Sequence, residues 1–215
     1  AAASKTFVPT AMSVIRPHST MRPVQPDDLD TESWILLHEL RLRGVFEADG
    51  GVVVTTLIDS GLVSQSPRGI RLTPAGRDAH AVWARVEPGS DLEATVERAY
   101  RRFLTINTEL LRLCSDWQVR PGGMPNNHKD PEYDWAIFDR LSSIDDRVGP
   151  LVSSVARGVD RFGSYRERLR SARRQVDDGG HDWLTSPRID SYHTVWMQLH
   201  EDLLLALGRE RASES

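Results

Sequence analysis

The sequence predicts a mainly α-helical protein, in which a small winged-helix element with a short β-wing precedes a helical bundle. A segment with strand periodicity stands between helical segments in the first half. Apolar residues then recur at steps of three or four, and we find no strand pattern in the second half. We therefore expect a flexible N-terminal arm at residues 1–30, a winged-helix-like domain at 31–88 and a bundle domain at 90–210.

Residues 61–77 carry the pattern of a wing. Two short apolar segments flank a Pro-Arg-Gly turn, and the second segment alternates apolar and basic side chains from Ile70 to Leu72. Thr73 follows as a predicted helix N-cap, and Pro74 occupies the first helical position, where a missing N–H costs nothing. These residues predict a two-stranded hairpin that leads directly into a helix.

The other helices are predicted from apolar residues at helical spacing. They cover residues 33–43, 52–60 (a short helix or an extended piece), 74–86, 90–117, 133–148, 151–162, 165–176 and 189–209. Gly149-Pro150 and Gly163 are expected to separate the helices of the bundle. Residues 120–131 are rich in turn residues and form a loop long enough to suggest a function.

Composition narrows the class of protein. Of the 215 residues 39% are apolar and 27% charged, and no apolar run approaches the roughly 20 residues of a membrane-spanning helix. A single cysteine, Cys114, excludes an internal disulfide and fits a reducing cytoplasm. It lies on an apolar helix face, which favours a buried thiol over a nucleophile. Residues 1–26 contain no acid and no continuous apolar segment, so they indicate a flexible arm or a cloning remnant instead of a secretory signal.

The Gly61-Leu-Val63 and Leu72-Thr-Pro-Ala-Gly76 segments resemble winged-helix regulators of the MarR type. That resemblance implies a cytoplasmic, ligand-responsive transcription regulator that binds DNA and dimerises through helices flanking the winged helix. The long amphipathic helix at residues 90–117 also has an apolar face that another surface must cover, so we expect a homodimer.

DNA contacts are expected from Thr55 and Thr56 in the helix before the wing and from Arg68 and Arg71 in the wing. The charge balance weakens this expectation, because residues 31–88 hold six basic and seven acidic side chains. The segment before the wing is also too short for two full helices of a helix-turn-helix. Solvated wing arginines are the alternative interpretation.

The second half is similar to the C-terminal region of actinobacterial proteins described as phosphoenolpyruvate-utilising or pyruvate-phosphate-dikinase-like. The similarity rests on Asp116-Trp117, Asn127-His128 with Asp130, residues 190–196, and Leu199-His200-Glu201. It implies a winged-helix-like piece followed by a helical tail, and it implies no reaction. We find neither a Gly-rich phosphate loop nor the context of a phosphorylated catalytic histidine, so dikinase activity is not expected.

A polar pocket inside the bundle is the predicted ligand site. His193, Trp196 and His200 share one face of the last helix, because they stand at i, i+3 and i+7. The expected ligand-binding residues are Trp117, His128, Tyr192, His193, Trp196 and His200. Aromatic walls with a few polar groups suit a small anionic or aromatic ligand. Two buried histidines satisfied by hydrogen bonds are the alternative.

An enzyme or small-molecule-binding protein that has lost DNA binding is the alternative function. His193 and His200 would then act as general acid or base, with Asp190 orienting His193, in a cyclisation, isomerisation or elimination. No metal site and no cofactor are expected. The arginines at residues 166–174 and the pair Asp145-Asp146 are expected on the surface.

Overall fold

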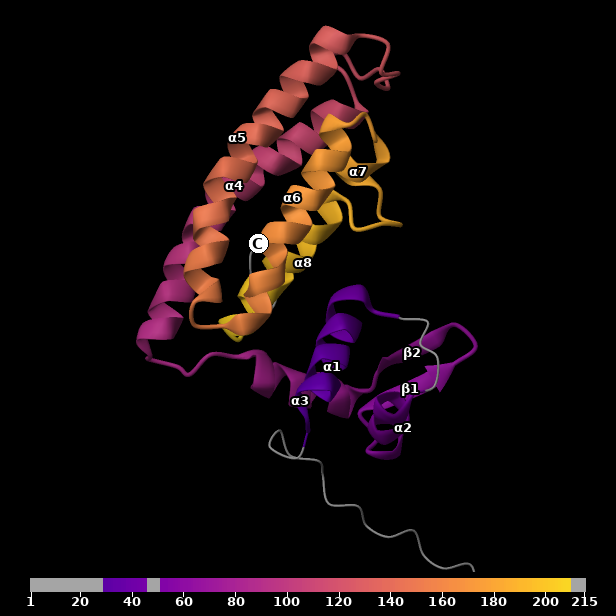
Figure 1. The fold of residues 1–215 in the computed structure, drawn as a ribbon, viewed down its shortest axis with the longest axis vertical. Coiled ribbons are helices and arrows are strands. Elements are labelled where there is room, and N and C mark those ends of the chain that lie inside the picture. Colours follow the sequence, from indigo (N-terminus) through magenta and orange to yellow (C-terminus); the bar gives the residue numbers. More distant parts are fainter. Residues whose placement is uncertain (1–28, 46–50, 210–215) are drawn as a thin grey trace, which may run out of the picture.

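The structure is a computed structural model, and it describes residues 29–45 and 51–209 (Figure 1). It confirms the predicted fold class, a mainly helical chain with one small two-stranded sheet. The helical bundle stands at one end of the molecule, and the winged-helix element lies beneath it at the other end. The predicted N-terminal arm lies almost wholly outside the described residues.

The winged-helix element follows the predicted order of helices and strands. It comprises α1 (Thr31–Arg43), α2 (Val52–Asp59), β1 (Val63–Ser66), β2 (Gly69–Leu72) and α3 (Pro74–Ala84). The strands pair antiparallel, with Val63 opposite Leu72 and Ser66 opposite Gly69. The segment at 52–60, for which two conformations were open, is helical.

The turn from the wing into α3 depends on a threonine and a glycine. The Thr73 hydroxyl accepts a hydrogen bond from the Gly76 amide at 3.0 Å, so Thr73 is the N-cap that the sequence predicts. The Thr73 amide donates to the Leu62 carbonyl at 3.0 Å and holds the helix start against β1. A Cβ at Gly76 would lie 2.0 Å from that carbonyl oxygen. Only glycine permits this close approach.

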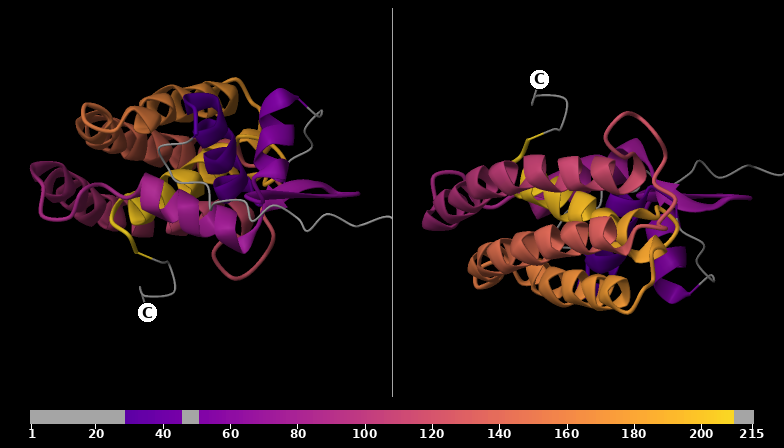
Figure 2. Two further views of the ribbon diagram at one scale, coloured as in Figure 1. Left: turned by 90° about the horizontal axis from the view of Figure 1, so that it is seen from below. Right: turned by 90° about the horizontal axis from the view of Figure 1, so that it is seen from above.

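Four long helices form the bundle, which runs up, down, up and down from the winged-helix end (Figure 1). Its elements are α4 (Asp91–Gln118), α5 (Pro131–Ala156), a 3₁₀ turn η2 (Asp160–Phe162), α6 (Gly163–Asp177), a short α7 (Asp182–Thr185) and α8 (Tyr192–Ala206). α4 and α6 each pack against both α5 and α8, an arrangement seen from above in Figure 2. The descending α8 brings its C-terminal end to the winged-helix element.

The predicted break at Gly149-Pro150 is wrong. α5 continues through both residues, because Pro150 lies on the exposed side and Gly149 lets the Arg166 side chain pack against the helix. Residues 151–162 are consequently the end of α5 plus η2, and α6 begins at Gly163 instead of after it. α8 begins at Tyr192, capped by the Ser191 hydroxyl, and not at residue 189.

Buried apolar side chains form two clusters, one from Trp34 to Leu72 and a larger one from Val86 to Leu207. The apolar face of α4 lies inside the larger cluster, and Leu104 and Leu111 are its partly exposed large side chains. Cys114 is buried, as predicted, and burial raises the pKa of its thiol to about 12. Within the described residues, no helix combines the length and apolarity needed to cross a bilayer.

Candidate functional site

A buried carboxylate lies at the junction between the winged-helix element and the bundle. Asp202 of α8 is fully buried and accepts a hydrogen bond from Arg161 Nε at 2.7 Å. Its other oxygen lies 3.3 Å from Nε2 of His38, which belongs to α1. Burial alone would raise the pKa of Asp202, but His38 and Arg161 outweigh it and leave the pKa below its usual value. The Asp202 carboxylate therefore links α8 to η2 through Arg161 and to α1 through His38.

His38 and His80 extend this contact into the winged-helix element. Nδ1 of His38 lies 3.1 Å from Nε2 of His80 in α3. If His38 donates Nε2–H to Asp202, its Nδ1 is an acceptor and His80 must donate Nε2–H to it. Nδ1 of His80 is then a buried acceptor with no partner. Burial and the neighbouring His38 lower the pKa of His80 to about 3, so this ring is neutral at pH 7.

Trp83 and Arg161 close the junction on one side. The Trp83 ring stacks on Trp34 with centroids 5.0 Å apart, and the Arg161 guanidinium lies 5.3 Å from the Trp83 ring. Arg161 also donates to the Ala84 carbonyl at 2.7 Å. A single arginine of η2 thus contacts both α8 and the end of α3.

Next to these residues lies a cavity of about 320 Å³ between α1, α3 and α6. Its walls include Trp83, Arg161, Arg168 and Tyr165. The Tyr165 hydroxyl is buried without a hydrogen-bond partner. Burial and the Asp202 carboxylate raise the pKa of Tyr165 well above its usual value, so the hydroxyl stays neutral. The cavity therefore has aromatic and guanidinium side chains in its walls, as many small-molecule sites do.

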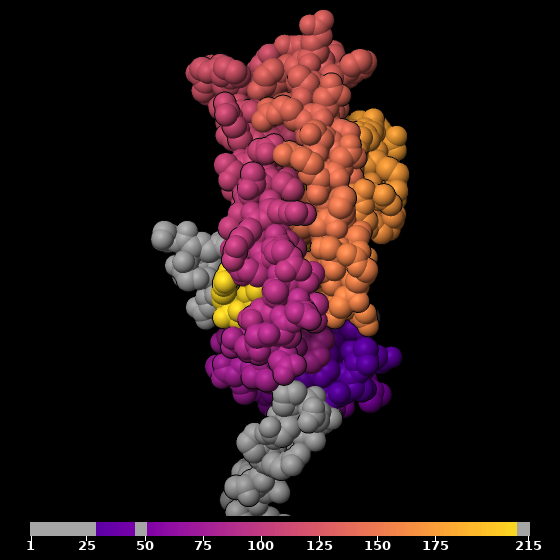
Figure 3. Space-filling model, turned by 90° about the vertical axis from the view of Figure 1, so that its left-hand side faces the viewer, coloured from indigo at the N-terminus to yellow at the C-terminus, as the bar shows by residue number. Residues whose placement is uncertain are grey.

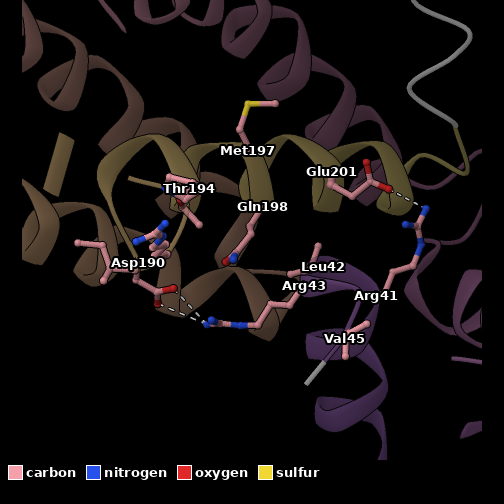
Figure 4. Close-up of a pocket in the computed structure, with 12 residues that line it drawn as sticks. Arg41, Leu42, Arg43, Val45, Asp190, Thr194, Met197, Gln198 and Glu201 are labelled. Carbon is pink, nitrogen blue, oxygen red and sulfur yellow. Dashed lines mark hydrogen bonds and ion pairs between the residues drawn. The ribbon is translucent and has the colours of Figure 1, made fainter. Parts of the chain in front are cut away.

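A larger groove of about 580 Å³ lies between the end of α1 and α8 (Figure 4). Two ion pairs cross it. Arg41 of α1 lies 2.7 Å from Glu201, and Arg43 lies 3.2 Å from Asp190. Figure 4 shows Gln198 lying between these two pairs. Any molecule that entered this groove would contact α1 and α8 together.

Tyr192 and Trp196, two of the predicted ligand residues, lie inside the bundle core. Both side chains are fully buried, and each polar atom has a protein partner. The Tyr192 hydroxyl donates to Asp145 at 3.2 Å, and Trp196 Nε1 donates to Asn107 at 2.8 Å. Neither residue lines the two cavities described above. Their role in ligand binding stays a prediction.

The two histidines of α8 differ in environment. His200 is buried, and its ring packs against Phe103 with centroids 5.0 Å apart. His193 is half-buried, and burial lowers its pKa. Both histidines belong to α8, whereas His128 packs against Trp117.

Trp117 and His128 are brought together at the far end of the bundle. Their ring centroids are 4.0 Å apart, and His181 packs against both rings. His128 adopts a left-handed backbone conformation (φ 54°), and its Nδ1 lies 3.2 Å from the buried carboxylate of Asp134. Across residues 29–45 and 51–209, no group of three or more metal-ligating side chains could hold an ion.

Asp190 has arginine partners instead of a histidine. Its carboxylate pairs with Arg43 and with Arg168, whose Nη2 lies at 3.0 Å and also donates to Gln198. The expected surface position of Asp145 is wrong. Asp145 is buried because it satisfies the Tyr192 hydroxyl and pairs with Arg166 at 3.1 Å.

The predicted DNA-contacting residues are exposed on the side of the winged-helix element that carries the wing. Thr55 and Thr56 project from α2, and Arg68 and Arg71 project from the hairpin. The Arg71 side chain lies 3.4 Å from the Ser64 hydroxyl within the wing. Exposure leaves all four side chains accessible to a partner.

The sequence interpretation missed the junction residues His38, His80, Arg161 and Asp202. A signal exists for two of them. His38 shares the buried stripe of α1 with Trp34 and Leu37, and Asp202 directly precedes three buried leucines of α8. A titratable group on an apolar face needs a buried partner. The partners themselves lie far away in the sequence and could not be identified.

Comparison with protein-family models, with curated proteins and with solved structures finds no match for this chain. The similarities to MarR-type regulators and to dikinase-like proteins therefore stay predictions.

Proposed function

We propose that this protein is a ligand-responsive winged-helix transcription regulator whose effector site is the groove between α1 and α8. The proposal rests on the polar contacts between the winged-helix element and the bundle. Buried charge at Asp202 and two ion pairs across the groove join an α-helix of the winged-helix element to the bundle. A ligand that replaced either ion pair would shift the population of arrangements of the two units.

The output of such a shift would be DNA binding. α2 presents one exposed stripe made of Val52, Thr55, Thr56 and Asp59, at i, i+3, i+4 and i+7. Methyl groups of valine and threonine suit thymine methyls in a major groove, and wing arginines suit phosphates or the minor groove. Arg41 and Arg43 are paired with bundle carboxylates, so the wing must supply much of the positive charge.

The chain should retard DNA from its own promoter region at low salt, where phosphate contacts contribute most. Replacing Arg68 and Arg71 together by glutamine should weaken this binding by about tenfold or more. The slope of the logarithm of the binding constant against the logarithm of salt concentration should become shallower by about two, because two phosphate contacts are lost. The measurement is a gel-retardation titration at two salt concentrations.

A matched control is the replacement of Arg157 and Arg170 by glutamine, because both are exposed bundle arginines and the net charge changes equally. The control should bind DNA as the unchanged chain does. Equal weakening by both double variants, or no retardation at low salt, would contradict the regulator proposal.

A second candidate is a small-molecule-binding protein or enzyme that has lost DNA binding. The specific observation in its favour is the exposed stripe of α2, which holds an acid and no base. Acid or base chemistry by His193 or His200 remains the proposed form. Ligand binding by a chain that never retards DNA would select this candidate.

We also propose a homodimer through α4, since Leu104 and Leu111 are exposed two turns apart on one face of that helix. Light scattering at micromolar concentration should give twice the mass of one chain. Leu111→Glu should shift the mass toward one chain, because it places a charge in the contact. A mass of one chain for the unchanged protein would remove the dimer from the proposal.

A further inference from the structure

A third cavity, of about 420 Å³, lies where α3 meets the C-terminal end of α8. Figure 3 shows this end of the chain, in yellow, directly above the winged-helix element. Four arginines line the cavity: Arg41 of α1, Arg77 of α3, Arg85 directly after α3, and Arg209 after α8. Asp78 is the acidic residue among its lining.

Local ion pairs account for only part of this positive charge. Arg41 pairs with Glu201 at 2.7 Å, and Arg209 pairs with Glu97 at 2.9 Å. Arg77 donates to the Leu72 carbonyl at 3.3 Å and has no carboxylate partner within the described part of the chain. Arg85 has no side-chain partner among the described residues.

The backbone at Gly208 leaves room for Arg85. A Cβ at Gly208 would lie 2.8 Å from Nε of Arg85, and the residue has a positive φ of 64°. The Arg85 guanidinium therefore lies over the turn that ends α8. The carbonyls of that helix end already receive amides from Leu207, Gly208 and Arg209, so they do not require the guanidinium.

The cavity also has an apolar side. Ala81, Val82 and Leu205 line it beside the arginines. Guanidinium groups bind phosphate oxygens in a bidentate way, and an apolar wall suits the organic part of a phosphate ester. The concave shape and the volume are those of a small-molecule site. A DNA duplex carries its phosphates on a convex surface and fits such a cavity poorly.

We propose that this cavity binds a small molecule carrying a phosphate or diphosphate group. Arg77 and Arg85 hold the phosphate oxygens, and Arg41 and Arg209 add charge at the rim. Because the site is built from both the winged-helix element and the bundle, occupancy ties the two units together. The proposal does not rest on DNA binding. Its phosphate-holding residues, Arg77 and Arg85, do not line the groove between α1 and α8, although Arg41 lines both cavities.

Calorimetric titration of the unchanged chain with inorganic pyrophosphate, at constant ionic strength, tests it. Pyrophosphate should bind with a dissociation constant of about 1 mM or tighter. Arg85→Gln should weaken binding by about tenfold or more, since one charged hydrogen-bonding group is lost. Arg85 is exposed, so the variant should keep its melting temperature. Arg157→Gln removes an exposed arginine elsewhere and should bind pyrophosphate normally.

Citrate and sulfate, used at the same ionic strength, distinguish a phosphate site from a general anion patch. Weaker binding of both supports the proposal. Equal binding of all three anions, or equal binding by Arg85→Gln and the unchanged chain, overturns it. Loss of DNA retardation by Arg85→Gln with normal pyrophosphate binding also overturns it, because the arginine would then contact a nucleic-acid backbone.

Discussion

Replacing Arg161 by methionine is expected to lower the free energy of unfolding by about 3–5 kcal/mol, because it leaves the buried Asp202 carboxylate without its guanidinium partner. Asp202 is fully buried, and Arg161 Nε lies 2.7 Å from one of its oxygens. The Ala84 carbonyl also loses its guanidinium donor. Urea unfolding at pH 7 measures the change.

Arg157→Met is the matched control, since Arg157 is exposed and, among the described residues, its side chain donates only to the Ser153 carbonyl. It should cost less than about 0.5 kcal/mol. The double variant Arg161→Met with Asp202→Leu should recover much of the lost stability, because both charges are then removed from the interior. A loss below about 1 kcal/mol in Arg161→Met would show that Asp202 is not held as an ion in the core.

The stability of the chain is expected to fall steeply between pH 6.5 and pH 4.5, and His80 is expected to cause much of the fall. The pKa of His80 is about 3 in the folded chain, against an ordinary value of 6.5 for histidine. Between these values the unfolded chain binds a proton that the folded chain does not. The folded state is therefore favoured above pH 6.5, and this stability is lost as the pH falls.

One such histidine contributes a slope of about 1.4 kcal/mol per pH unit across that window. His80→Gln keeps a side-chain amide that can donate to His38 but removes the titration. The stability difference between the unchanged chain and His80→Gln should consequently shrink by about 2–3 kcal/mol from pH 6.5 to pH 4.5. Urea unfolding at several pH values measures it.

His181→Gln serves as the control, because His181 is exposed at the far end of the bundle. This variant should keep the steep slope of the unchanged chain. If His80→Gln kept the same slope as well, the histidine would titrate equally in the folded and unfolded chain, and the proposed neutral, buried ring would be wrong.

The wing shows how much of the fold can be predicted from residues that are close together in the sequence. Thr73, Pro74 and the alternation from Ile70 to Leu72 predicted a hairpin leading into a capped helix, and the structure has that hairpin and that cap. Their effects act within a few residues along the chain, through backbone dihedral angles and nearby hydrogen bonds. The long helix at residues 90–117 was predictable for the same reason, since a repeated apolar face defines a helix without knowledge of its partner.

Gly149-Pro150 shows where local rules fail. Proline lacks an amide donor and usually ends a helix, yet α5 continues because packing of its buried face against the neighbouring helices outweighs one missing hydrogen bond. Asp145 shows the same limit for polar residues. Its burial depends on Tyr192 and Arg166, which no pattern around residue 145 reveals.

The sequence by itself determined the fold class, the wing and the helical faces of this protein. The tertiary structure alone decided which polar groups meet, as in the contact of His38 with an aspartate more than 160 residues later. It also separated Trp117 and His128 at the far end of the bundle from the junction where α8 reaches the winged-helix element. The physical reason is that helix periodicity selects a face, whereas the pairing of buried charges depends on where two folded units touch.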